Sequence, residues 1–210
     1  MGVTVSILFL KEKNQKNFWR KTMFCAEQRI HVMVILETKR TILRPFEESD
    51  AADLYEYAKD PRVGPMAGWR PHESVEESLN IIQTVFSAPH CFAIVEKSAG
   101  KVIGSAGFTG RRHGESTVDE IGYALSPDYW GRGLMPEVVA ELLRFGFDEL
   151  GLYSIWCGHY ADNDRSRRVI EKSGFTFVFS ERLSDEFSED RLTYRYVYLC
   201  HDWERRRHRG

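Results

Sequence analysis

Strand-like and helix-like segments alternate between residues 41 and 200, and this alternation is the strongest constraint on the fold. Helical spacing or capping residues mark four segments, 48–60, 75–88, 134–150 and 163–174. Apolar and β-branched residues dominate seven shorter segments, 41–46, 91–97, 101–109, 118–126, 153–160, 175–180 and 193–200. No repeat or flexible linker interrupts this order. We therefore predict an α/β fold, one domain whose central sheet of about six to seven mostly antiparallel strands is flanked by helices.

Local signals define several of these boundaries. Ser49 or Asp50 can cap the first helix, and Ser74 with Glu77 has the spacing of a capping box for the second. Turn residues 98–100 predict a hairpin. In the third helix, apolar residues recur every three or four positions, so one stripe should pack on the sheet. The stripe consists of Val138, Val139, Leu142, Leu143, Phe147 and Leu150.

Composition excludes several protein classes. A chain of 210 residues that is 42% hydrophobic can bury a full core. No run approaches the roughly 18 apolar residues of a membrane helix, so we expect a soluble, cytoplasmic protein that does not enter a membrane. The cysteines lie far apart and have neither disulfide-framework nor zinc-site spacing, so we expect reduced thiols and no metal. They are Cys25, Cys91, Cys157 and Cys200.

Charge is distributed unevenly along the chain. Residues 1–32 sum to +4, residues 204–210 to +3, and residues 33–203 to −9. An acidic body repels nucleic acid, so DNA or RNA binding would have to rest on the two ends, and we expect none. The first segment shows neither sustained periodicity nor a signal-peptide layout. We therefore expect an extension outside the fold at 1–32, a domain at 33–203 and a basic tail at 204–210.

Two glycines precede the third helix. Pro136 fits a first helical turn, where its missing N–H costs nothing, so the helix should begin near Leu134, directly after Gly131 and Gly133. Helix starts present unpaired N–H groups and a positive dipole end, and glycines let an anion approach them. This arrangement suits phosphate binding, although such a turn can also be only a tight connection. Pro136 rules out a dinucleotide fingerprint, and Leu134 rules out a Walker A loop.

The motifs around this loop resemble those of a known family. Four motifs carry the resemblance: E-I-G-Y-A-L at 120–125, Y-W-G-R-G-L at 129–134, Asn163-x-x-Ser166, and E-K-S-G-F at 171–175. Together they resemble the GNAT superfamily of N-acetyltransferases, and more closely its RimJ/RimL-type branch. The resemblance runs from about Lys39 to Cys200. It implies transfer of an acetyl group from acetyl-CoA to a primary amine.

The resemblance also implies residues for the coenzyme. The pyrophosphate of acetyl-CoA would lie against Trp130, Gly131, Arg132, Gly133, Leu134 and Met135. A backbone N–H near Ala124 or Leu125, in an irregular strand, would bind the oxyanion. Asn163 would bind the pantetheine arm, or act as an ordinary helix cap, or both.

Two positions depart from the family pattern. The chain has Asp128 where the family has Gln or Arg, so backbone donors and Arg132 would have to hold the phosphates. It also has Ile170 where many members have the tyrosine that protonates the leaving thiolate. In RimL-like members a serine serves instead, which assigns that role to Ser166. A solvated or helix-capping hydroxyl is the alternative for Ser166.

Acetyl transfer to an amine also needs a proton acceptor, because an amine with a pKa around 10 must lose a proton before it attacks. Glu120 is the candidate, since strand alternation sets it on one face beside the small residues Gly122 and Ala124. Several family members place their base at this point. A solvated glutamate at a strand end is the alternative reading.

Acceptor recognition is assigned to three further residues. Trp69 and His72, in a segment that includes Arg70, resemble the acceptor-side loop of the family, although core packing is the default for a tryptophan. His159 closes a strand and either faces the acyl group or is structural. The acidic loop at 181–190 would favour a cationic amine, or it is only a solvated loop. Its acidic residues are Glu181, Asp185, Glu186, Glu189 and Asp190.

The acceptor itself stays open between a small-molecule amine and a protein N-terminus. One alternative function is a catalytically weak module of the same fold that binds acyl-CoA. No heptad pattern predicts a dimer, and the sequence leaves open whether the protein forms a homodimer.

Overall fold

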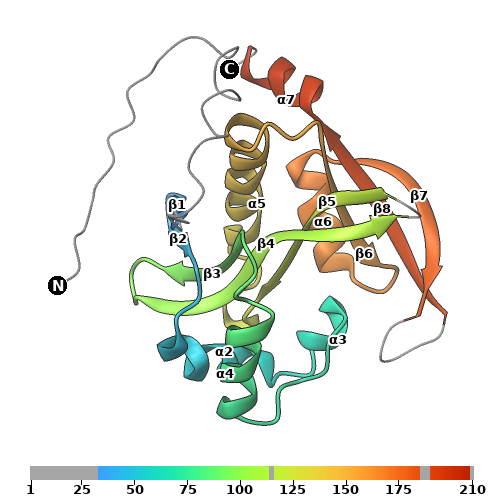
Figure 1. The fold of residues 1–210 in the computed structure, drawn as a ribbon. Helices are drawn as coiled ribbons and strands as arrows, with labels where there is room; N and C mark the ends of the chain where they lie inside the picture. Colours follow the sequence, from blue (N-terminus) through green and yellow to red (C-terminus); the bar gives the residue numbers. More distant parts are fainter. Residues whose placement is uncertain (1–32, 114–115, 185–189, 209–210) are drawn as a thin grey trace, which may run out of the picture. The chain divides into compact units, whose positions relative to one another are not determined.

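The computed structural model describes residues 33–113, 116–184 and 190–208, and these form an eight-stranded sheet (Figure 1). The strands are β1 (Leu36–Glu37), β2 (Thr41–Arg44), β3 (Cys91–Glu96), β4 (Lys101–His113), β5 (Ser116–Leu125), β6 (Ser154–Tyr160), β7 (Thr176–Leu183) and β8 (Arg191–Leu199). Their order is β1-β2-β3-β4-β5-β6-β8-β7. Neighbours are antiparallel except β5 and β6. The predicted mixed sheet is confirmed, but its strand count was too low because β1 is too short for any sequence pattern.

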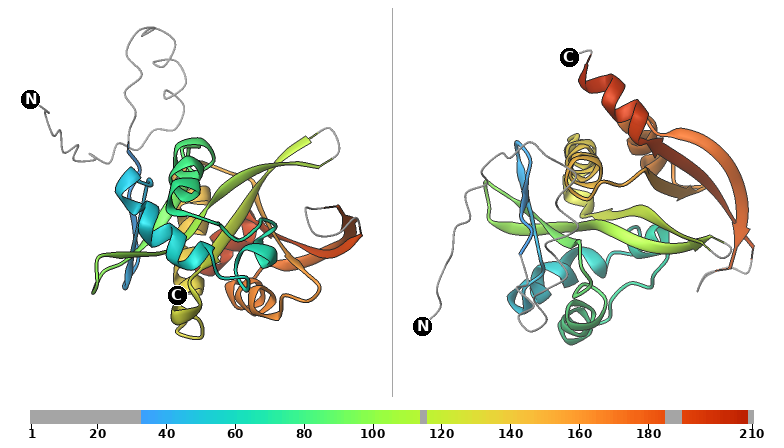
Figure 2. Two further views of the ribbon diagram at one scale, coloured as in Figure 1. Left: turned by 90° about the horizontal axis from the view of Figure 1, so that it is seen from below. Right: turned by 45° about the horizontal axis from the view of Figure 1, so that its top comes forward.

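Helices cover both faces of this sheet (Figure 2). They are α2 (Ala51–Ala58), α3 (Gly64–Ala67), α4 (Val75–Thr84), α5 (Leu134–Arg144), α6 (Asp164–Ser173) and α7 (Cys200–Arg207). Shorter turns are η1 (Glu48–Asp50), η2 (Pro127–Tyr129) and η3 (Phe145–Glu149). The four predicted helices are present, whereas α3 and α7 were not predicted. Within the described part of the chain, no helix has the length and apolar character of a membrane span. The predicted extension at 1–32 lies outside the described residues.

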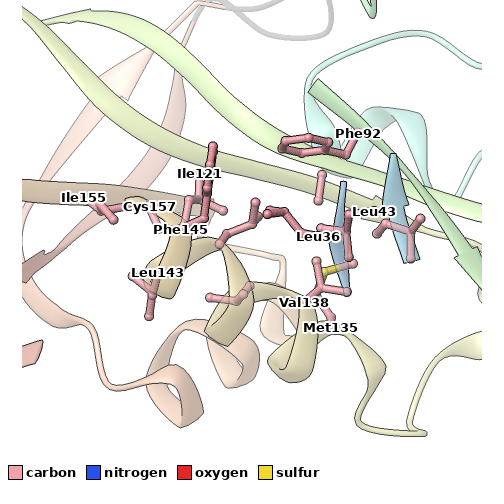
Figure 3. Close-up of a cluster of buried hydrophobic side chains, with 14 of the residues drawn as sticks. Leu36, Leu43, Phe92, Ile121, Met135, Val138, Leu143, Phe145, Ile155 and Cys157 are labelled. Atoms are coloured by element: carbon pink, nitrogen blue, oxygen red, sulfur yellow. The ribbon is translucent and has the colours of Figure 1, made fainter. Parts of the chain in front are cut away.

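The two faces of the sheet bury separate apolar clusters because strand side chains alternate. On β3, Phe92 and Ile94 belong to the cluster under α5, which Figure 3 shows. Their neighbours Ala93 and Val95 belong to the cluster under α2 and α4. The sheet is therefore the middle layer of three, and its central strands are fixed from both sides.

The end of the third predicted helix differs from a regular α-helix. Its last turn, η3, is π-helical and so holds more residues per turn than the rest. The apolar stripe consequently shifts its phase: Phe145 is 2% exposed, while Leu150, predicted to be buried, is 36% exposed. The other five residues of the predicted stripe are buried.

Of two predicted helix starts, one needs correction and the other is confirmed in position. Ser74 accepts the N–H of Glu77 at 3.1 Å, but the Glu77 carboxylate accepts from Glu73 at 2.5 Å, so the capping box is only half formed. Asp50 is the N-cap of α2, one of the two caps predicted, although its side chain makes no cap hydrogen bond and the turn η1 precedes the helix. Asp50 lies at the end of that turn, where its carboxylate accepts the N–H of Glu47 at 2.8 Å.

The C-terminal segment belongs to a helix that contacts the domain. Helix α7 continues past residue 203, so the predicted boundary before the basic tail falls inside it. The Arg206 guanidinium donates to the carbonyl of Ser173 at 3.2 Å and lies 5.5 Å from the centre of the Tyr198 ring. These contacts attach α7 to the end of α6 and to β8.

Candidate active site

The parallel strands β5 and β6 pair at only two positions and then separate. Glu120 is paired with Trp156 and Ile121 with Cys157, and beyond these pairs each strand continues alone along this edge. The missing ladder opens the middle of the sheet. Two cavities lie at this opening, of about 360 and 480 Å³.

The larger cavity is lined by the glycine loop and by the starts of α5 and α6, and we call it the loop cavity. The smaller is lined by residues of β4, β5, β6 and β8, and we call it the sheet cavity. The two cavities share a set of residues, which we call the junction. The junction consists of Met66, Ala67, Tyr123, Ala124, Asn163 and Ser166. Ligands bound in the two cavities would therefore meet between β5 and α6.

Gly131 and Gly133 have a backbone conformation that side chains rarely adopt. Both have φ of +74°, in the left-handed region where a Cβ is strained. Gly133 is the N-cap of α5, so the helix begins at Leu134 as predicted. No atom lies within 4 Å of the position that a Cβ on Gly131 would occupy. The loop thus presents bare backbone to open space at a helix start.

Positively charged side chains surround the loop cavity. Arg62, Arg165, Arg168 and Lys172 line it, and sequence reasoning missed all four. Three of them recur in α6 at spacings of three and four, which places them on one helical face and could have revealed them. The guanidinium of Arg165 lies 4.3 Å from the centre of the Trp130 ring. These four side chains place positive charge around the cavity, whereas position 128 carries an aspartate in place of the Gln or Arg of the family.

Arg132, predicted to hold phosphate, points elsewhere. Its guanidinium lies over the Tyr129 ring at 4.8 Å, and it is not among the described residues that line the loop cavity. All nine other predicted coenzyme residues line this cavity: Ala124, Leu125, Trp130, Gly131, Gly133, Leu134, Met135, Asn163 and Ser166.

The ladder between β4 and β5 determines which backbone N–H groups face the opening. The pairing is continuous through Leu125, so the irregularity expected in this strand is absent from the described register. Ser126 donates its N–H to Ile103 at 2.8 Å. Because bonded and non-bonded pairs alternate in antiparallel strands, the Ala124 N–H faces β4 and the Leu125 N–H faces away from it. Of the two backbone N–H groups predicted to bind the oxyanion, only that of Leu125 thus faces away from β4, towards the opening.

At the junction, Asn163 and Ser166 are fixed by the start of α6. Asn163 caps the helix, accepting the N–H of Ser166 at 3.0 Å, and its amide donates to the carbonyl of Met66 at 3.2 Å. The hydroxyl oxygen of Ser166 lies 2.9 Å from that of Tyr123. Sequence reasoning did not select Tyr123, because strand alternation alone placed it towards the core.

Glu120 lines the sheet cavity, as strand alternation predicted, but it is not a solvated residue at a strand end. Its side chain is 12% exposed, and Oε1 accepts a hydrogen bond from Arg195 at 2.8 Å. Arg195, 5% exposed, also donates to Glu181 at 2.6 Å. Glu120 and Arg195 thus form an ion pair that is largely shielded from solvent.

His159 also lines the sheet cavity, but both of its ring nitrogens have protein partners. Nδ1 lies 2.8 Å from the carbonyl of Tyr160, which can only accept, so Nδ1 carries a proton. In the neutral ring, Nε2 then accepts from the Tyr196 hydroxyl at 3.2 Å. His159 therefore helps to hold β6 against β8.

The predicted acceptor residues divide into two groups. Trp69 lines the sheet cavity. His72 lines neither cavity among the described residues: it is buried, its Nδ1 lies 2.8 Å from Ser78 Oγ, and burial lowers its pKa. Its position is structural, supporting the loop that carries Trp69 at a ring separation of 5.2 Å.

The acidic loop is only partly described. Glu181 pairs with Arg195, and Asp190 pairs with Arg182 at 2.7 Å. These two carboxylates are thus partly neutralised, which weakens the steering predicted for a cationic amine. Asp185, Glu186 and Glu189 lie outside the described residues.

Comparison with known proteins identifies the family. The acetyltransferase (GNAT) domain matches residues 40–176. The chain belongs to this family. The uncharacterized N-acetyltransferase YoaA of Bacillus subtilis is 32% identical over 149 residues, which cover 67% of this chain and 82% of that protein. As a GNAT member, the chain is an acetyl-CoA-dependent N-acetyltransferase.

Solved structures share the GNAT fold. A GNAT-family acetyltransferase from Bacillus anthracis superimposes with a TM-score of 0.71 at 24% identity, covering 80% of this chain and 99% of that one. A ribosomal-protein-S5-alanine acetyltransferase from Vibrio fischeri superimposes with a TM-score of 0.62 at 21% identity, covering 81% of this chain and 98% of that one.

The loop cavity fits acetyl-CoA, because it combines helix-start N–H groups, bare glycine backbone and four cations.

Proposed function

We propose that the protein acetylates a primary amine by direct attack of that amine on the thioester of acetyl-CoA. The observation that carries this proposal is the junction, where a cavity suited to a coenzyme meets a second cavity between the separated strands. The coenzyme would occupy the loop cavity and the amine the sheet cavity. Such positioning alone lowers the barrier to reaction substantially.

Named groups of the chain would assist the attack. The Leu125 N–H would bind the oxyanion, Glu120 would take a proton from the amine through water, and Ser166 would protonate the leaving sulfur. Burial raises the pKa of the Cys91 thiol in the sheet cavity to about 11, so it stays protonated and is a poor nucleophile. This favours direct transfer over an acyl-cysteine intermediate.

We also propose that the chain belongs to the RimJ/RimL-type branch. The motifs at 120–125 and 129–134 and the presence of a ribosomal-protein acetyltransferase among its fold neighbours support this. The acceptor would then be a protein N-terminus or a small amine. The sheet cavity, at about 360 Å³, has room for an N-terminal residue or a compact amine.

A thiol-release assay tests this proposal. Acetyl-CoA is mixed with the full chain and a panel of polyamines, small aliphatic amines and peptides with free N-termini. We expect thiol release that depends on one acceptor class and yields an acetylated product by mass spectrometry. Thiol release that is independent of every amine, with acetate as the product, would contradict amine transfer.

A further inference from the structure

The junction holds a pair of hydroxyl groups from distant segments of the chain. Tyr123 comes from β5 and Ser166 from the first turn of α6, and their oxygens lie 2.9 Å apart. Of the six junction residues, only these two carry hydroxyl groups. The remaining polar side chain, Asn163, already caps α6 and donates to Met66. The pair is therefore the proton-carrying group where the two ligands would meet.

The Tyr123 hydroxyl has a second acceptor on the same residue. The Tyr123 hydroxyl also lies 3.4 Å from the carbonyl oxygen of Ser166, which can only accept. A phenol is more acidic than an aliphatic alcohol, and Tyr123 is the partner of Ser166 Oγ within the described ranges. The single tyrosine proton can be shared between both oxygens of Ser166, and in that arrangement the serine keeps its own proton to donate into the junction.

Burial keeps the tyrosine neutral. It raises the pKa of Tyr123 well above its usual value, and it raises the pKa of the neighbouring Cys157 thiol to about 12. Both groups stay protonated at the pH values at which amines are acetylated. Tyr123 is consequently a permanent hydrogen-bond donor rather than a source of protons.

We propose that Tyr123 is a positioning residue that orients Ser166 as a proton relay from the attacking nitrogen to the leaving sulfur. This rests on the proposed function. After attack, the nitrogen carries one extra proton, and the C–S bond breaks with its electron pair on sulfur. Ser166 Oγ takes the proton from nitrogen while its own proton passes to sulfur. The serine ends neutral, Tyr123 never ionises, and all atoms and charges balance.

The relay supplies the leaving sulfur with a proton that two other positions do not provide. Ile170 stands where many family members have the donor tyrosine, and it is 1% exposed in the core. Glu120 lines the sheet cavity, accepts a hydrogen bond from Arg195 and is not one of the junction residues. A relay through Ser166 moves the extra proton that the nitrogen carries after attack to the sulfur. It needs neither a tyrosine at position 170 nor Glu120 for this step.

A double-mutant cycle on the full chain, with the acceptor found in the thiol-release panel, tests the relay. We expect Ser166→Ala to lower kcat by about 100-fold and Tyr123→Phe by about 10-fold. The double variant should be no slower than Ser166→Ala, because Tyr123 acts through the serine. The KM for acetyl-CoA and the affinity for coenzyme A should stay close to native. Tyr55→Phe removes an exposed hydroxyl on α2, which lies 3.4 Å from the Glu73 carbonyl, and should leave kcat unchanged.

Incorporating 3-fluorotyrosine at position 123 guards against a simple folding defect. This residue keeps the hydroxyl and the shape of tyrosine but donates more strongly, so kcat should equal or exceed the native value. A fluorotyrosine chain as slow as Tyr123→Phe, or effects of the two variants that multiply, would overturn the relay while leaving acetylation intact. A native chain that acetylates no amine would instead overturn the proposed function, and the relay with it.

Discussion

At the scale of single residues, Arg195 joins the candidate base to a second carboxylate. It is nearly buried and holds two carboxylates, Glu120 at the sheet cavity and Glu181 on β7. Removing either carboxylate leaves the buried positive charge of Arg195 with only one negatively charged partner. Any test of Glu120 as a base therefore has to separate a loss of catalytic activity from a loss of folding stability.

Glu181→Gln provides that separation, because it breaks an Arg195 ion pair without changing a described lining residue of either cavity. We expect Glu120→Gln and Glu181→Gln to lower the free energy of unfolding by a similar amount, about 1–3 kcal/mol. Only Glu120→Gln should lower kcat/KM, by about 100-fold, if Glu120 is the base. Thermal melting and steady-state kinetics measure the two effects. Equal kinetic losses in both variants would show that Glu120 acts through the ion pair alone.

At the scale of elements, the start of α5 depends on two glycines in the left-handed backbone conformation, separated by one residue. Gly131 and Gly133 reach φ of +74° without strain, and the chain then enters α5 directly. The same helix buries its apolar stripe against the sheet, which fixes the direction in which its N–H groups point. The geometry that we propose binds phosphate is thus a consequence of how the helix packs.

Gly131→Val tests this element, with Gly151→Val as its matched control. Both glycines have positive φ, +74° and +68°, and neither has an atom within 4 Å of a Cβ. Each variant should therefore lose about 1–2 kcal/mol of stability through backbone strain. Titration calorimetry with coenzyme A should show a large loss of affinity for Gly131→Val and a native affinity for Gly151→Val. A native affinity for Gly131→Val would remove the loop from the coenzyme site.

At the scale of the whole molecule, the two apolar clusters explain how the middle of the sheet stays open. One cluster packs under α5 and the other under α2 and α4, so the sheet is held from both faces. The strands β5 and β6 can then separate after two pairs without the fold coming apart. The cavities are thus a property of the complete domain.

The domain boundary at Met33 gives a prediction at this scale. We propose that residues 1–32 lie outside the fold, so a chain that begins at Met33 should keep the native melting temperature, coenzyme A affinity and acetylation rate. The physical reason is that the described core closes without that segment. Differential scanning fluorimetry and the thiol-release assay measure the outcome. Loss of folding or of activity on truncation would show that the segment is part of the domain.

The sequence by itself determined the order of the elements, the start of α5 and the family, because these depend on residues close together in the chain. Helical spacing, strand alternation and glycines before a helix act within a few residues of each other. They also sufficed to place Glu120 on the cavity face of β5, but not to find its partner.

Only the tertiary structure decided which side chains meet. Tyr123 and Ser166 are 43 positions apart, and Glu120 and Arg195 are 75 apart. Their contacts exist because packing on both faces of the sheet brings β5, α6 and β8 together around the gap beside β5. No local pattern records such a meeting, since the hydrophobic effect that drives it is not directional and many pairings of distant segments satisfy it equally.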